Sequence, residues 1–248
     1  MRLHVLTGMI KRRLLVNFRA DPEVVGRLLP EPFRPKLQGG FAIVGICLIR
    51  LEHERPSGVP DVLGITSENA AHRFAVEWTD EPCVARQGVY IVRRHTDSAI
   101  NQLAGGRVFG IEHDLAHFTV MDSHGHIDFD MQSKDGEFVV KVRGDESDRF
   151  TDDSCFKSLE EVSTFFEGGS IGYSPSQRGN QLSGIDLWMP DWKVGAFEAS
   201  EARSSYFDDP VRFPAGSIEY DHTLIMRDLR HEWRSTEGLE MAQRHVPA

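Results

Sequence analysis

The feature that most constrains the fold of this chain is a succession of short segments rich in β-branched and aromatic residues, each bounded by turn-forming residues. Such segments are typical of strands. Between two of them, Lys134, Asp135 and Gly136 form a turn typical of a β-hairpin, and Ile127, Phe129 and Met131 alternate with polar neighbours. We therefore predict strands at residues 12–20, 40–52, 73–78, 88–94, 115–122, 126–132, 137–144, 181–189 and 217–229.

Helix signals are few by comparison. "DPEVVGRLLP" (21–30) has Asp21 as N-cap and a proline at the first helical position, and "SLEEVSTFFEGG" (158–169) opens on the capping box of Ser158 and Glu161. A third helix is predicted within "DSAINQLAGG" (97–106). Many strands and few helices predict a mainly β (α+β) fold, a closed or cone-like, mostly antiparallel β-barrel with short outer helices, because closure removes exposed sheet edges. No repeat or linker divides the sequence, so we expect one domain over residues 1–248.

Composition narrows the class of partner. A formal net charge of −10 disfavours nucleic acid, whose binding depends on basic residues, and no apolar run is long enough to span a membrane. The three cysteines (Cys47, Cys83 and Cys155) lie far apart, which fits reduced thiols in a cytoplasmic protein. We expect a small-molecule ligand, no cofactor, and a homo-oligomer, most simply a dimer. The basic clusters at 11–13 and 93–95 are interpreted as solvated faces, and Cys47 as core filler.

An ordered set of motifs resembles the acetoacetate decarboxylase-like superfamily. The motifs are "DPEVVGRLLPEPFRP", "GFAIVGICLIRL", "HRFAVEW", "GVYIVRRHTDS" and "GGRVFG", followed by "FFEGGSIGYSPS", "SSYFDDPVRFPAGSIEYD" and "LIMRDLRHEW". The resemblance covers nearly the whole chain and points to a bacterial branch of that superfamily. It implies a β-barrel or cone that encloses a pocket for a small molecule, although fold alone does not give function.

One family feature is missing from the sequence. The decarboxylases carry Gly-Arg-Glu-x-x-Gly-x-Pro-Lys, whose lysine forms a Schiff base with the keto acid. A neighbouring cation activates that lysine, which is a known example of nucleophile activation. The matching stretch here runs from Gly106 to His113, and the position of the lysine falls on His113 or Asp114. The resemblance therefore implies that decarboxylation through an imine is lost.

Acid–base groups remain in and around this stretch. His113 is the candidate catalytic acid–base group, with Glu77 as its electrostatic partner, because an imidazole titrates near neutral pH. Arg107 and Arg73 are candidate clamps for a substrate carboxylate, with Glu112 as a further candidate substrate-binding residue. Each of these residues also has a purely structural interpretation, such as a surface ion pair or an outward-facing strand position.

The direction in which His113 points is left open by strand alternation. Alternation sends His113 and His117 to one face, and Phe118 and Val120, which resemble core residues, to the other. We expect His113 or Glu112 to point into the main cavity, an expectation that fails if the cavity and the core are the same space. A metal site is not expected, because His113 and His117 on a strand would stand about 13 Å apart.

The predicted function is a pocket for a small oxygenated or carboxylated metabolite, with acid–base, lyase-type chemistry that does not use a Schiff base. The alternative is a non-catalytic metabolite-binding or sensing protein on the same fold. A metal-dependent hydrolase ranks last. Titratable groups in mutual contact in the pocket would favour the enzyme, whereas apolar walls with arginine anchors would favour the binding protein.

Overall fold

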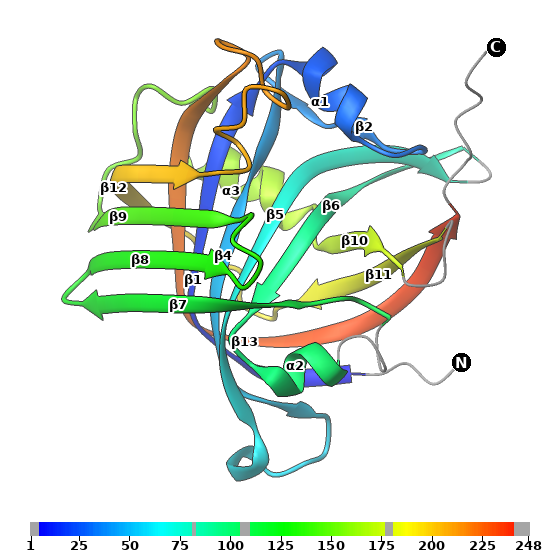
Figure 1. Cartoon of the computed structure of the whole chain (residues 1–248), viewed down its shortest axis with the longest axis vertical. Helices are drawn as coiled ribbons and strands as arrows, with labels where there is room; N and C mark the ends of the chain where they lie inside the picture. The colour runs from blue at the N-terminus through cyan, green and yellow to red at the C-terminus, as the bar shows by residue number, and fades with distance from the viewer. Residues whose placement is uncertain (1–4, 81–82, 105–109, 177–180, 241–248) are drawn as a thin grey trace.

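In the computed structural model, which describes residues 5–80, 83–104, 110–176 and 181–240, most of the chain belongs to one large sheet (Figure 1). The described strands are β1 (Val5–Ala20), β2 (Arg34–Pro35), β3 (Leu37–Gln38), β4 (Phe41–Pro56), β5 (Ile65–Asp80), β6 (Val84–Thr96), β7 (Asp114–Ser123), β8 (His126–Ser133), β9 (Val139–Ser147), β10 (Ile171–Pro175), β11 (Gln181–Trp188), β12 (Gly195–Ser204) and β13 (Ile218–Glu240).

The sheet closes on itself twice, in two rings of strands. The small ring contains β11, β10, β6, β5, β4, β1 and β13, and the large ring contains β6, β7, β8, β9, β12, β13, β1, β4 and β5. The rings share five strands, and the long β13 joins them because its Ile225 region pairs with β12 while its Glu240 end pairs with β11. In Figure 1, β7, β8 and β9 lie stacked on one side of the shared strands, and β10 and β11 lie on the other.

Pairing within the sheet is mostly antiparallel. The two parallel pairs among the described strands both involve β6, which runs parallel to β7 at His95 and Thr96 and parallel to β10 at Val89 and Tyr90. The prediction of a closed or cone-like, mostly antiparallel sheet is therefore confirmed, with parallel exceptions at the strand where the two rings meet.

The central shared strands are largely buried on both faces, because each face meets a different ring. On β4, Val44, Ile46 and Leu48 pack into the core of the large ring with residues of β8 and β9. The alternate residues Cys47 and Ile49 pack on the opposite face, with residues of β1, β13 and helix α3. The molecule therefore has two apolar compartments, separated by β1, β4 and β5.

Three α-helices lie at the predicted positions: α1 (Pro22–Leu28), α2 (Ala99–Ala104) and α3 (Leu159–Glu167). The Asp21 side chain accepts hydrogen bonds from the first turn of α1, and Ser158 caps α3 by accepting from the amide of Glu161. The other half of the capping box differs from the prediction, because the Glu161 carboxylate accepts from the amide of Lys157. Gly168 ends α3 as predicted, whereas the glycine stop predicted at 105–106 lies outside the described residues.

Some elements escape the sequence-based prediction. The strands β10 and β12 and the short 3-10 helix at Asp61–Leu63 were not expected. Among the described residues, no helix is both long and apolar enough to cross a membrane.

Candidate functional site

A large pocket of about 710 Å³ lies inside the small ring of strands. All seven strands of that ring contribute to its lining, and α3 contributes Phe166. The volume falls within the range of about 300–1,000 Å³ that is usual for small-molecule sites. Most of the wall is apolar, with Leu15, Ile49, Ile91, Leu187 and Trp233 among the lining side chains.

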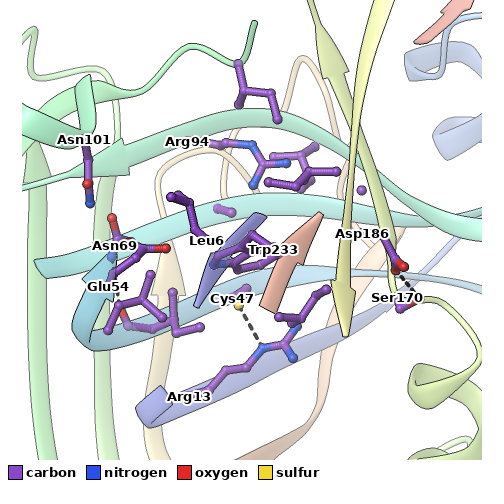
Figure 2. A pocket seen from close by; sticks show the side chains of 18 of the residues that line it. Leu6, Arg13, Cys47, Glu54, Asn69, Arg94, Asn101, Ser170, Asp186 and Trp233 are labelled. Atoms are coloured by element: carbon purple, nitrogen blue, oxygen red, sulfur yellow. Dashed lines mark hydrogen bonds between the residues drawn. The ribbon is translucent and has the colours of Figure 1, made fainter. Parts of the chain in front are cut away.

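Four of the described arginines line this apolar pocket, of which Arg55 on β4 pairs with Asp61. We call the other three the guanidinium cluster: Arg13 on β1, Arg73 on β5 and Arg94 on β6. Figure 2 shows Arg13 near the bottom of the view and Arg94 near the top, with a hydrogen bond from Arg13 to Cys47 of β4. In the register of the sheet, Cys47 pairs with Ala71, and Ala71 pairs with Arg94. The register therefore places Cys47 and Arg94 in one row across β4, β5 and β6.

None of the described partners of the guanidinium cluster is a carboxylate. Arg13 donates to the Cys47 sulfur (3.2 Å) and weakly to the Met226 sulfur (3.8 Å). Arg94 donates to the Ser174 hydroxyl (3.1 Å), and Arg73 donates to the Asn17 side-chain oxygen (2.5 Å) while its guanidinium carbon lies 4.6 Å from the centre of the Phe166 ring. Nε and Nη1 of Arg73 and Nη2 of Arg94 are buried without a hydrogen-bond partner among the described residues.

Burial therefore weighs against the positive charge on these arginines. It lowers the pKa of Arg73 to about 10, a shift opposed by Cys47 and supported by the nearby Arg13, and it lowers the pKa of Arg94 to about 10. Both side chains still carry their charge at neutral pH. A buried guanidinium without a carboxylate partner destabilises the folded state. An anion that supplies the missing acceptors offsets this cost.

His113 lines the same pocket, just before β7 begins. Its Nδ1 is buried without a partner among the described residues, and burial lowers its pKa to about 3, a shift that the Arg94 charge reinforces. The nearby His95, which is fully buried, has a pKa lowered to about 4, by burial first and by Arg93 second. Both imidazoles are neutral at neutral pH.

The two-ring architecture resolves the alternation conflict on β7. Ala116, Phe118 and Val120 pack against the core of the large ring, and His117 is exposed. His113 precedes the strand and lines the pocket of the small ring. The cavity and the core are different compartments, so the expectation that His113 or its neighbour reaches the main cavity is met by His113.

Of the other predicted site residues, some line the pocket and others lie outside it. Arg73 lines the pocket together with His113. Glu77 follows Arg73 on the same strand but is exposed and is not part of the pocket lining, and its charge instead faces Lys36. Glu112 is exposed and also outside the lining. Arg107 lies outside the described residues.

Three of the described acids line the pocket: Glu54, Asp186 and Glu167, the last of which is exposed at the end of α3. Asp186 accepts a hydrogen bond from Ser170 (2.7 Å; Figure 2), and Glu54 lies 4.0 Å from the imidazole of the buried His231. No group of three metal-ligating side chains is found within the described ranges.

Sequence reasoning missed Arg13, Arg94 and Cys47. The two arginines lie in the clusters at 11–13 and 93–95, which were interpreted as solvated; that interpretation is wrong for Arg12, which is 1% exposed, and for Arg13 and Arg94, which line the pocket. The available signal was the apolar sequence beside each cluster, at residues 14–16 and 89–92, because apolar residues on both faces of a strand predict burial of both faces. Cys47 is buried as expected, but it also faces the pocket.

Comparison with known proteins gives a family and a fold. The model of the family DUF2071, described as an uncharacterized conserved protein, matches residues 8–217. None of the curated proteins matches the chain.

Solved structures with the same fold are distant in sequence. Acetoacetate decarboxylase from Legionella pneumophila aligns with a TM-score of 0.59 at 14% identity, covering 96% of this chain and 87% of that chain. An acetoacetate decarboxylase-like enzyme from Sphingomonas wittichii RW1 aligns with a TM-score of 0.62 at 15% identity, covering 97% and 94%. The enduracididine biosynthesis enzyme MppR, complexed with pyruvate, aligns with a TM-score of 0.57 at 11% identity, covering 97% and 90%.

Proposed function

The chain belongs to the DUF2071 family and has the acetoacetate decarboxylase-like fold, and we propose that its pocket binds a small, largely apolar molecule that carries a carboxylate. The observation that carries this proposal is the guanidinium cluster, which lies in an apolar cavity without a carboxylate partner among the described residues. A neighbour of the same fold, MppR, was solved with pyruvate, a small carboxylate, and this supports the same class of ligand.

Electrostatics favour an anion over a neutral ligand. Each carboxylate oxygen accepts hydrogen bonds from guanidinium donors, and such charge-assisted bonds contribute about 1.5–3 kcal/mol each. The described residues leave nitrogens of Arg73 and Arg94 without an acceptor, and a bound carboxylate would supply one. The apolar walls, including Ile49, Leu187 and Trp233, then cover the hydrocarbon part of the molecule.

Of the two function classes, the binding or sensing protein is the better supported. The pocket has apolar walls with arginine anchors, and neither of its two histidines, His95 and His113, is hydrogen-bonded to a carboxylate among the described residues. With a pKa of about 3, His113 is a poor general acid at neutral pH, because its imidazole is almost entirely in the neutral form there. Lyase-type acid–base chemistry on His113 is the second candidate, favoured by its unpartnered Nδ1 at the pocket wall.

Imine chemistry has no place in this proposal. The chain has six lysines, all in described segments, and none of them is part of the pocket lining: Lys11, Lys36, Lys134, Lys141, Lys157 and Lys193.

The test compares a carboxylate with its neutral counterpart. Octanoate and octanamide have similar shape, so titration calorimetry at pH 7.5 isolates the value of the charge. We expect octanoate to bind about tenfold more tightly than octanamide, and the variants Arg73→Met and Arg94→Met each to weaken octanoate by about tenfold. Arg149→Met, at an exposed surface arginine, is the matched control and should leave both affinities unchanged.

Pyruvate and phenylpyruvate extend the same titration to shorter and aromatic carboxylates. Equal affinity for octanoate and octanamide, or no binding of any carboxylate in this set, would overturn the proposal. Borohydride added with acetoacetate should leave every lysine unmodified, as measured by mass spectrometry, and a trapped adduct would restore Schiff-base chemistry.

A further inference from the structure

A buried series of hydrogen bonds leads away from the pocket behind Arg73. Arg73 Nη2 donates to Asn17 Oδ1 (2.5 Å), Asn17 Nδ2 lies 2.9 Å from His222 Nε2, and His222 Nδ1 lies 2.5 Å from Asp221 Oδ2. All four side chains are buried, with at most 3% of any residue exposed. A fully buried polar series is costly unless each group is satisfied, so its arrangement constrains what it does.

The register of the sheet aligns these residues across four neighbouring strands. His222 of β13 pairs with Asn17 of β1, Asn17 pairs with Gly45 of β4, and Gly45 pairs with Arg73 of β5 (Figure 1 shows these strands side by side). Gly45 leaves the space through which Arg73 reaches Asn17, because a Cβ there would stand 3.1 Å from Asn17 Oδ1 and 2.2 Å from the Val16 carbonyl oxygen.

The donors and acceptors of the series have one consistent assignment. A guanidinium only donates, so the atom of Asn17 that faces Arg73 is the oxygen, and the amide nitrogen faces His222 and the Leu15 carbonyl (2.9 Å). His222 Nε2 must then accept, which places the ring proton on Nδ1, from where it is donated to Asp221.

Asp221 fixes the far end of the series as an ionised acceptor. Its burial would raise its pKa, but hydrogen bonds from His222, from the Ser154 hydroxyl (2.5 Å) and from the Cys155 amide (2.9 Å) lower the pKa to about 2. The arrangement is not that of a serine hydrolase, because Ser154 lies on the Nδ1 side of His222 while Nε2 faces Asn17.

A neutral amide therefore holds the charged guanidinium. A carboxylate at position 17 would pair with Arg73 and cancel the charge that attracts an anion, whereas the Asn17 oxygen orients the group and leaves its charge, Nε and Nη1 available. We infer that Asn17 and His222 are positioning residues that hold Arg73 ready for the carboxylate of the ligand and so give the pocket its preference for an anion. This inference rests on the proposed function of the pocket.

The decisive variant is Asn17→Asp, which changes one atom group and adds a charge. With octanoate and octanamide as probes at pH 7.5, we expect this variant to lose about tenfold in octanoate affinity and to keep its octanamide affinity. His222→Phe, which removes the acceptor for the Asn17 amide, should weaken octanoate by about fivefold and leave octanamide unchanged. His222→Gln, whose amide oxygen can accept from Asn17, should restore most of the octanoate affinity.

The outcomes separate positioning from simple stability. If both probes weaken equally in these variants, or if octanoate binds Asn17→Asp as it binds the wild type, the inference is overturned. If octanoate binding is weakened by Arg73→Met but not by the Asn17 and His222 variants, the inference is overturned and the proposed function stands. No carboxylate binding to the wild type overturns the proposed function, and with it the role given to Arg73.

The wild-type protein supplies a test that does not depend on folding of the variants. In a sample labelled with ¹⁵N-histidine, the assigned tautomer makes Nδ1 of His222 protonated and Nε2 unprotonated at neutral pH. Saturation with octanoate should perturb these His222 nitrogens and leave those of the exposed His126 unchanged. A protonated Nε2, or a His222 signal that is indifferent to bound octanoate, would contradict the inference.

Discussion

Two adjacent arginines on β1 show how the same residue type is used in opposite ways. Arg12 and Arg13 point to opposite faces of the strand. Arg12 lies within 2.5 Å of Glu68 and 3.5 Å of Asp122, so its buried charge is compensated inside the protein. The described partners of Arg13 are two sulfur atoms, and its charge faces the pocket. A buried arginine with a carboxylate partner, such as Arg12, therefore has a structural role, whereas one without such a partner, such as Arg13, is a candidate for ligand binding.

The three thiols should differ in their reactivity for the same local reasons. Burial, followed by the charge of Asp221, raises the pKa of Cys155 to about 12, so almost none of it is thiolate at pH 8. We predict that iodoacetamide at pH 8 alkylates the exposed Cys83 first and Cys155 last. Octanoate should slow the alkylation of Cys47, which faces the pocket, without slowing that of Cys83.

Peptide mass spectrometry over a time course measures all three rates in one sample, and Cys83 serves as its internal control. Alkylation of Cys155 at the rate of Cys83 would contradict the pKa argument. Alkylation of Cys47 that is insensitive to saturating octanoate would count against occupancy of this pocket.

Two of the residues that sequence reasoning proposed for the site lie in the lining of the pocket. Arg73 and His113 line the pocket as expected, because the resemblance and the local pattern both pointed there. Glu77 does not: it is on the same face as Arg73, but it lies near the end of β5, outside the pocket lining, and its side chain is exposed. Arg94 could not be placed, because its hydrogen-bond partner Ser174 lies on β10, far away in sequence, and comes near only through the pairing of β10 with β6.

Among the elements, strands and helix starts were predictable from local chemistry, and pairing was not. The alternating segments and the caps at Asp21 and Ser158 are local signals, and each predicted strand and helix forms. The short β10 and β12 carry weak patterns, and the parallel pairs of β6 with β7 and β10 are set by long-range closure of the rings. Element type follows from short stretches of sequence, whereas the order of strands in a sheet depends on contacts between distant ones.

Gly45 and Gly26 provide a matched pair that tests the packing of elements. A Cβ at Gly45 would lie 2.2 Å from a backbone oxygen of β1, so Gly45→Ala must force β1 and β4 apart. We predict a loss of at least about 3 kcal/mol in the free energy of unfolding, a large effect for one methyl group. Gly26→Ala, in α1 with nothing within 4 Å, should instead stabilise the protein by about 0.5–1 kcal/mol.

Urea unfolding at pH 7.5 measures both changes on the full chain. If Gly45→Ala unfolds at the same urea concentration as the wild type, the close approach of β1 and β4 at this register is not present in solution.

On the scale of the whole molecule, the two rings share strands and so bury polar groups between two apolar compartments. His72 lies in the shared strand β5 and faces the large-ring core, with Nε2 2.9 Å from the Ser204 hydroxyl, and burial lowers its pKa to about 3. His95 lies on β6 where the two rings meet, and His113 lines the small ring. Self-association of the chain, its cytoplasmic location and its single-domain organisation stay predictions.

These buried histidines make the fold sensitive to mild acid. A histidine whose pKa is lowered in the folded state takes up its proton in the unfolded chain first, so unfolding becomes more favourable as pH falls through about 6.5. The folded pKa values are about 3, 4 and 3 for His72, His95 and His113. Between pH 7 and pH 5 these three imidazoles therefore stay largely unprotonated in the folded protein. Each histidine then contributes a loss of roughly 2 kcal/mol over that window, or about 6 kcal/mol together, which is comparable to the stability of a typical domain.

We therefore predict a steep fall in the free energy of unfolding between pH 7 and pH 5, measured by urea titration at each pH. Asp221, whose pKa is lowered to about 2, adds stability that is lost only below about pH 4, outside this window. His72→Gln should make the fall shallower by about one histidine's share, whereas His126→Gln should not, because that exposed imidazole has its pKa raised by Asp145 and acts in the opposite direction. Equal stability at pH 7 and pH 5 would mean that the pKa values of the three histidines are not lowered in the native protein, which would contradict the burial that the two-ring fold imposes on them.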